Sequence, residues 1–149
     1  MEKSFRTLRG FVARKETEED TYFAYSATIR IAGEIPDMEE ISARLGLSPT
    51  HSHHKGERRG AQSTPYRQDM WSYSPPVGGI EPLHKHLDAL WSSLKPHKHY
   101  LLELKKSLGV DVFCGYRSNC DHAGIEVPHT SLEMFVELEI PFGVSIIVT

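Results

Sequence analysis

The chain has 149 residues, of which 39% are hydrophobic, and this is enough for one globular domain that buries its own core. Its formal net charge of −3 at pH 7 gives no general case for binding nucleic acid or anionic membranes. Nine histidines are the one unusual count, and their protonation would make the net charge depend strongly on pH.

The start of the chain, MEKSFRTLRG, has no apolar core of a signal peptide, and no later stretch is apolar for long enough to span a bilayer. The two cysteines, Cys114 and Cys120, do not suggest a disulfide framework. We therefore expect a soluble cytoplasmic protein with no membrane association.

Residues 1–20 are interpreted as an N-terminal extension, and residues 21–149 as a single domain. The domain opens with a strand over Thr21–Ile31, where apolar and polar residues alternate with the period of a half-buried strand. The apolar side of this strand holds Phe23, Tyr25, Ala27, Ile29 and Ile31.

A short helix is expected over Asp37–Leu45, because Asp37 can cap its first turn and Gly46 can end it. Thr50–Gln68 has no periodicity and reads as a long polar and basic loop, of a length that is often functional or disordered. The loop leads to a strand near Asp69–Ser74.

The second half of the chain begins with a helix after Pro82, because leucines and Trp91 recur at the spacing of one helical face. The further expected elements are a helix over Leu101–Leu108, a strand over Val110–Tyr116 with Cys114 in the core, a short strand over Ile125–Val127, a helix starting at Thr130 and a final strand over Gly143–Thr149.

This order of elements predicts an α+β fold with a mixed, largely antiparallel sheet and helices packed on one face. Two ferredoxin-like halves are one arrangement that would satisfy the order. Such a sheet leaves edge strands open, so a homo-oligomer is a further possibility.

Several short features of the first half recur in a known family. These are the strand and helix between Thr21 and Leu45, the turn at Leu45 and Gly46, Pro49 with Thr50, Lys55 with Gly56, and Trp71 downstream. On these features the chain resembles the bacterial family DUF4279, over roughly Thr21 to Val148. The resemblance implies no activity, because the family has no established reaction, and the histidines after Thr50 are not part of its pattern.

The basic residues of the long loop are candidates for binding an anion or a partner. Lys55, Arg58 and Arg59 can hold a phosphate or an acidic protein surface, since arginine pairs with planar anions through two hydrogen bonds. The alternative is a mobile loop whose charges confer solubility. Trp71 is a candidate for contact with a partner or for stacking on a base, which keeps nucleic acid as a minor option. The alternation of Trp71 with its neighbours in the strand also fits packing within the sheet.

Three histidines of the same loop, His51, His53 and His54, are candidate metal ligands, because imidazoles suit zinc, copper or nickel. No carboxylate or thiol follows at a recognised ligand spacing, so solvated side chains are the alternative. Cys120 and His122 can supplement such a site only if the fold brings them close.

Catalytic signatures are absent from the sequence, which has no Gly-x-Ser-x-Gly elbow, phosphate-binding loop or dinucleotide fingerprint. We therefore assign no catalytic residue and no cofactor, with zinc or nickel as a secondary possibility. The sequence favours a non-enzymatic binding or protein-interaction module that uses the basic, His-rich loop 50–68, with another protein as partner. The alternative is a metal- or anion-binding enzyme with its site on that loop.

Overall fold

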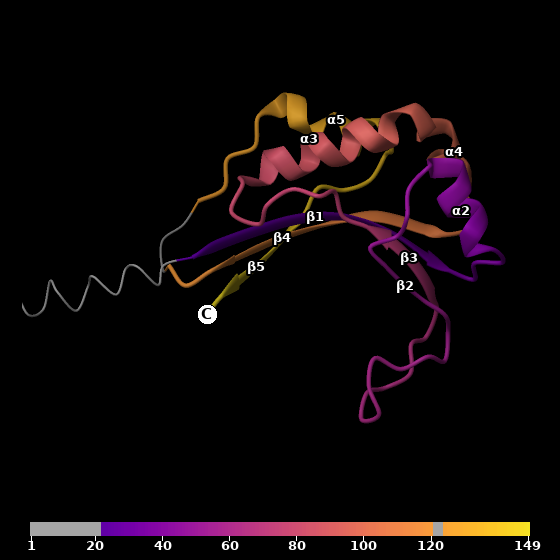
Figure 1. Cartoon of the computed structure of the whole chain (residues 1–149). Coiled ribbons are helices and arrows are strands. Elements are labelled where there is room, and N and C mark those ends of the chain that lie inside the picture. The colour runs from indigo at the N-terminus through magenta and orange to yellow at the C-terminus, as the bar shows by residue number, and fades with distance from the viewer. Residues whose placement is uncertain (1–21, 121–123) are drawn as a thin grey trace, which may run out of the picture.

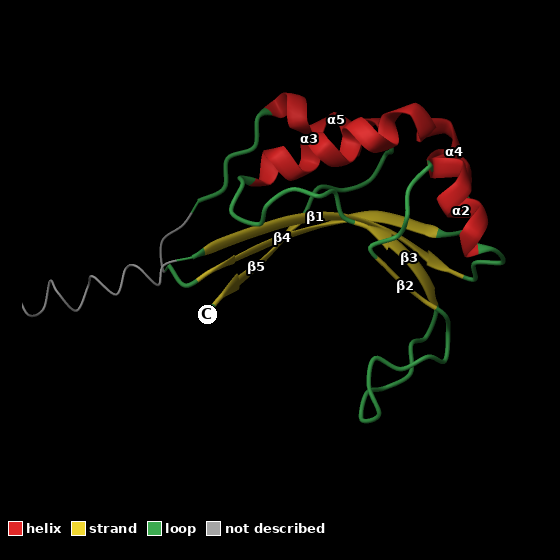
Figure 2. Ribbon diagram, viewed as in Figure 1, coloured by secondary structure: helices red, strands yellow, loops and turns green. Residues whose placement is uncertain are grey.

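A computed structural model describes residues 22–120 and 124–149, so the expected N-terminal extension lies outside the described residues. The described part contains a five-stranded sheet with helices packed on one of its faces (Figures 1 and 2). This confirms the predicted α+β fold. None of the described helices is both long and apolar enough to cross a membrane.

Two long antiparallel strands form the middle of the sheet, β1 (Phe23–Gly33) and β4 (Gly109–Ser118). In both strands, alternate residues point to the helices, as the sequence predicts. Ala27, Ile29 and Ile31 of β1 are buried there, beside Cys114 of β4. The core therefore lies between the sheet and the helices.

The other strands are β2 (His51–His53), β3 (Asp69–Tyr73) and β5 (Val144–Val148), and the order across the sheet is β2-β3-β1-β4-β5. All neighbours are antiparallel except β4 and β5, which are parallel. Strands β1 to β4 and their helices make one ferredoxin-like βαββαβ unit, and β5 is added beside β4. The described sheet thus holds one such unit, because its five strands are too few for two halves.

The helices begin and end where the local sequence dictates. In α2 (Met38–Leu45), the Asp37 carboxylate accepts hydrogen bonds from the amides of Glu39 and Glu40, and Gly46 ends the helix with φ of 66°. The remaining helical segments are α3 (Leu83–Leu94), η2 (Lys95–His97), α4 (Lys98–Leu104), η3 (His129–Leu132) and α5 (Glu133–Glu137).

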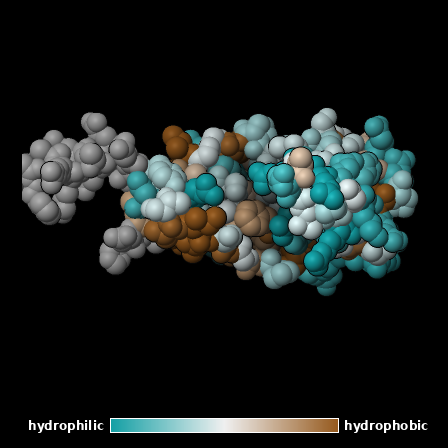
Figure 3. All heavy atoms as spheres, turned by 90° about the horizontal axis from the view of Figure 1, so that it is seen from below, coloured by the Kyte–Doolittle hydropathy of each residue, from teal (hydrophilic) through white to brown (hydrophobic). Residues whose placement is uncertain are grey.

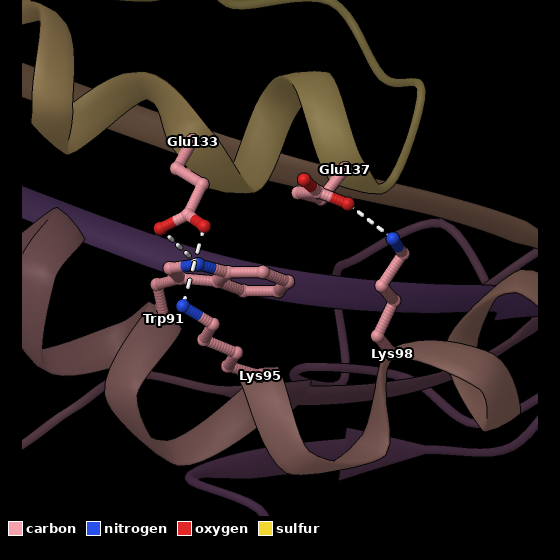
Figure 4. A network of polar contacts seen from close by, with 5 residues as sticks. All are labelled: Trp91, Lys95, Lys98, Glu133 and Glu137. Atoms are coloured by element: carbon pink, nitrogen blue, oxygen red, sulfur yellow. Dashed lines mark hydrogen bonds and ion pairs between the residues drawn. The ribbon is translucent and has the colours of Figure 1, made fainter.

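Polar contacts fix the short helix α5 against α3 and the start of α4 (Figure 4). The Glu133 carboxylate accepts hydrogen bonds from Trp91 Nε1 and Lys95 Nζ, both at 3.2 Å. Glu137 pairs with Lys98, which lowers the pKa of the Glu137 carboxyl. These contacts hold the segment that leads into β5.

Three sequence predictions need correction. His51–His53 form strand β2, because they pair with β3 although their polar side chains show no strand periodicity, so the loop shortens to residues 54–68. Ile125–Val127 form no strand; their partly buried side chains pack on the core without a strand partner. The helix expected over Leu101–Leu108 ends at Leu104, before a run of turns.

Candidate functional site

The face of the sheet opposite the helices is here called the open sheet face, and no described helix covers it (Figures 1 and 2). Strand alternation assigns its side chains, because residues that flank the buried positions of each strand point the other way. These side chains include Ala24, Ser26, Thr28, Arg30 and Ala32 of β1, Met70 and Ser72 of β3, and Asp111, Phe113, Gly115 and Arg117 of β4.

The loop between β2 and β3, residues 54–68, leaves the sheet on this same side and projects away from the helices (Figure 1). Its base is fixed by Asp69, whose carboxylate accepts hydrogen bonds from the amides of Lys55 at 2.8 Å and Ile35 at 2.9 Å. These two bonds lower the pKa of the Asp69 carboxyl. The loop thus starts from a defined position beside the open sheet face.

Among the described residues, two shallow hollows on the open sheet face bear on its chemistry. The first, of about 300 Å³, is lined by Ser26, Phe113, Gly115, Arg117 and Ile147 among others, and so lies over β1, β4 and β5. Hydrophobic surface gathers at the end of the molecule that carries the C-terminus, whereas the opposite end is largely hydrophilic (Figure 3). The face therefore pairs an apolar end with a polar end beside the loop.

The second hollow, of about 490 Å³, lies toward the loop and includes Arg30, Gln68, Met70 and Asp111 in its lining. Arg30 donates from Nε to Asp111 Oδ1 at 2.8 Å and from Nη2 to Asp111 Oδ2 at 2.7 Å. The guanidinium also lies 5.2 Å from the centroid of the Phe113 ring. The carboxylate and the aromatic ring that contact Arg30 therefore both come from β4. The Arg30–Asp111 ion pair lies between the two hollows.

His53 joins the loop to the sheet. Its ring stacks on Tyr66 with centroids 3.5 Å apart and planes at 6°, and its Nδ1 lies 3.1 Å from His51 Nε2. Burial and the neighbouring His51 lower the pKa of His53. The neutral imidazole is the form that this environment favours.

The basic candidates Lys55, Arg58 and Arg59 are all exposed on the loop, and Arg58 donates to the carbonyl of Ser63 at 3.4 Å. With Arg67 and the single acid Glu57, residues 51–68 carry a formal charge of +3 in a chain whose total is −3. Positive charge is therefore concentrated on the loop that projects from the same side of the sheet as the open sheet face.

Trp71 lies on the other side of the sheet from the loop cations. Its side chain is fully buried under α2, and its Nε1 donates to Ser42 Oγ at 2.9 Å. The indole packs within the core, which is the alternative that its alternation in the sequence allowed. We do not include it in the candidate surface.

The three histidines do not point to one centre. His51 and His53 contact each other, whereas His54 Nδ1 faces Asp69 Oδ1 at 3.8 Å. Within residues 22–120 and 124–149, no group of three or more His, Cys, Asp or Glu side chains is arranged to hold a metal ion. His122 lies outside the described residues, so its relation to Cys120 is not described.

Sequence reasoning missed the strand residues of the open sheet face, above all Arg30, Asp111, Phe113 and Arg117. The alternation of β1 and β4 was the available signal, because it places these residues opposite the core. With helices predicted on one face, the alternation implied an uncovered face opposite them, but it could not show which residues of different strands meet there.

Comparison with known proteins gives one match. A family model described as a domain of unknown function, DUF4279, matches residues 22–149, which is nearly the whole chain. No curated protein and no solved structure matches the chain.

Proposed function

This chain belongs to DUF4279, a family of unknown function, and we propose that it is a protein-binding module that takes an extended acidic segment of its partner on the open sheet face. The observation that carries the proposal is the uncovered face flanked on the same side by the cationic loop 54–68 (Figure 1). An apolar hollow at one end and loop cations at the other suit a segment with an apolar side chain followed by carboxylates.

Charge complementarity selects an acidic partner. The charged side-chain groups of Lys55, Arg58 and Arg59 are exposed and make no ion pair within the described residues, whereas the guanidinium of Arg30 is already paired with Asp111. Arg117 adds an exposed cation beside the apolar hollow. An acidic segment would meet cations at both ends of the face.

A protein partner is favoured over nucleic acid by the side chains in the middle of the face. RNA-binding domains with a four-stranded sheet stack bases on aromatic residues of that sheet. Here the outward positions of β1 and β3 hold small or aliphatic residues and Arg30, and none of those described is aromatic. The neighbouring strands do place aromatic rings on this face, but Phe113 lies under the Arg30 guanidinium and His53 under the Tyr66 ring, so β1 and β3 offer close approach to a peptide backbone and side chains.

The binding experiment uses a defined probe, a peptide with one phenylalanine followed by a run of glutamates. The full chain is titrated with this peptide, with the same peptide carrying glutamine for glutamate, and with oligothymidylate, while backbone amide shifts are recorded. We expect shifts at Arg117, Gly115 and the loop with the acidic peptide alone. Equal binding of the glutamine peptide, or tighter binding of the oligonucleotide, would contradict the proposal.

A substitution in the hollow locates the apolar contact. A Cβ atom on Gly115 would lie 2.7 Å from Ser26 Oγ and 3.2 Å from Phe113 Cε1, so a larger side chain must occupy the hollow or displace them. We expect Gly115→Leu to weaken binding of the acidic peptide about tenfold, the equivalent of about 1.4 kcal/mol. Ile80→Leu, at an exposed position in the segment before α3, is the control that should leave binding unchanged.

A further inference from the structure

Strand β5 leaves one edge of the sheet unpaired. Within the described residues it pairs only with β4, so its outer row of backbone amides and carbonyls has no strand partner. Its sequence, VSIIV, has no charge, proline or glycine to discourage pairing with another strand. The strand also exposes apolar surface that pairing would cover, since Ile146 is 59%, Ile147 45% and Val148 57% exposed.

The opposite edge differs in the features that control edge pairing. Strand β2 has three residues, His51–His53, and their side chains are polar. Short, polar edges resist pairing with other chains. Large exposed apolar side chains are instead concentrated around β5, with Phe142 just before the strand, Phe113 on the neighbouring β4, and Tyr22 and Phe23 at the start of β1, one strand further in.

We propose that a second copy of this chain covers this edge, with the two β5 strands paired antiparallel about a twofold axis. A register centred on Ile146 uses the whole strand and places Val144 opposite Val148 of the second copy. The strand is complementary to itself in this register, because apolar residues meet apolar residues on the helix side and Ser145 meets Ile147 on the open sheet face. No like charges face each other, and twofold dimers are the commonest closed assemblies.

The polar contacts of α5 with Trp91, Lys95 and Lys98 restrain the segment that leads into β5, and so they restrain the position of this edge (Figure 4). A twofold axis perpendicular to the sheet would join the two sheets into one of ten strands with both open faces on the same side. The two apolar hollows would meet near the axis, since Ser145 and Ile147 line each of them. The two cationic loops would lie roughly 40 Å apart at the outer edges.

Sedimentation of the full chain tests the assembly. We expect wild-type protein at micromolar concentrations to sediment at twice the mass of one chain. Ile146→Lys should give monomer, because two ammonium groups would meet at the axis. Val136→Lys, which alters an even more exposed valine on α5 away from the edge, should remain a dimer. A monomeric wild type, or a dimeric Ile146→Lys protein, would overturn the proposal.

A crosslink locates the axis without relying on a destabilised variant. Directly opposed residues of an antiparallel pair have Cα atoms about 4.5–5.5 Å apart, which suits a disulfide. In a Cys120→Ser background, with Cys114 buried in the core, Ile146→Cys should form a covalent dimer on mild oxidation and Val136→Cys should not. Equal crosslinking of both variants would reject pairing through β5, whatever the oligomeric state.

Discussion

The ring of Tyr66 lies flat on the ring of His53, with the two centroids 3.5 Å apart. His53 belongs to β2 and Tyr66 to the returning arm of the loop, so this stack closes the base of the loop against the sheet. Two backbone hydrogen bonds between Tyr66 and the outgoing arm, at Gly56 and Glu57, lie just beyond it. The loop that carries the basic residues is therefore anchored at its base.

Removing the stacked ring should loosen this anchor. Tyr66→Ala loses a contact of about 1 kcal/mol, so the amide of Gly56, which donates to the Tyr66 carbonyl, should exchange with solvent roughly fivefold faster. Tyr66→Phe keeps the ring and should exchange like the wild type. Hydrogen exchange followed by NMR measures both. Unchanged protection in Tyr66→Ala would show that the backbone bonds alone hold the loop.

Stability should fall below neutral pH through His53. Its pKa is lowered by burial first and by His51 second, so the unfolded chain takes up a proton at a higher pH than the folded protein. The contribution of neutral His53 to the free energy of unfolding is therefore complete above the ordinary histidine pKa of about 6.5, and it is lost as the pH falls below that value. Protonation of His53 would also leave its Nδ1 unable to accept a hydrogen bond from the His51 ring.

Urea unfolding between pH 7 and pH 5 measures this effect. His53→Phe keeps an aromatic ring against Tyr66 without a titrating group, so its stability should depend less steeply on pH than that of the wild type. The control His99→Phe changes an exposed histidine of α4 and should keep the wild-type slope. Parallel pH profiles for the wild type and His53→Phe would exclude His53 as the source.

The contact of Glu133 with Trp91 should stabilise the attachment of α5. Glu133→Ala leaves the nearly buried Trp91 Nε1 without its acceptor, which costs about 1–2 kcal/mol in the free energy of unfolding. Glu103→Ala removes an exposed ion pair with Lys106 and should cost less than about 0.5 kcal/mol. Chemical denaturation compares the two variants. Equal losses would mean that Trp91 does not need this acceptor.

The histidines of β2 and the loop offer two adjacent imidazoles rather than three convergent ones. We therefore expect zinc or nickel to bind weakly and His51→Ala to abolish that binding, with His54→Ala leaving it unchanged. Isothermal titration of freshly purified, untagged protein measures the affinity. Stoichiometric metal that is retained on purification and lost only when all three histidines are replaced would instead support the metal-dependent enzyme.

The sequence predicts most of the fold because its main elements are strongly patterned. The alternation in β1 and β4, the leucine face of α3 and the cap of α2 each report a local physical preference, and each agrees with the structure. Strand β2 escaped prediction because its three residues become a strand only through pairing with β3. Pairing between distant segments leaves no periodic mark in so short a stretch.

The sequence predicted the loop part of the candidate surface but not the part formed by the strands. Lys55, Arg58 and Arg59 stand out as a cluster in the sequence, whereas Arg30 and Asp111 lie 81 positions apart and meet only through the pairing of β1 with β4. The apolar hollow likewise depends on which face the helices leave open. Spacing shows which residues of one strand share a face, but it does not show which strands pair or where a hollow forms between them.

The central claim is that loop cations and the open sheet face bind an acidic segment, and a matched pair of variants tests it most directly. Arg58→Ala with Arg59→Ala removes two positive charges from the loop, and Lys85→Ala with Lys106→Ala removes two from the exposed helical side. Affinity for the phenylalanine-glutamate peptide should fall at least tenfold in the loop variant and stay near wild type in the other. Equal losses in both variants would show that net charge alone attracts the peptide, and unchanged affinity in the loop variant would contradict the account.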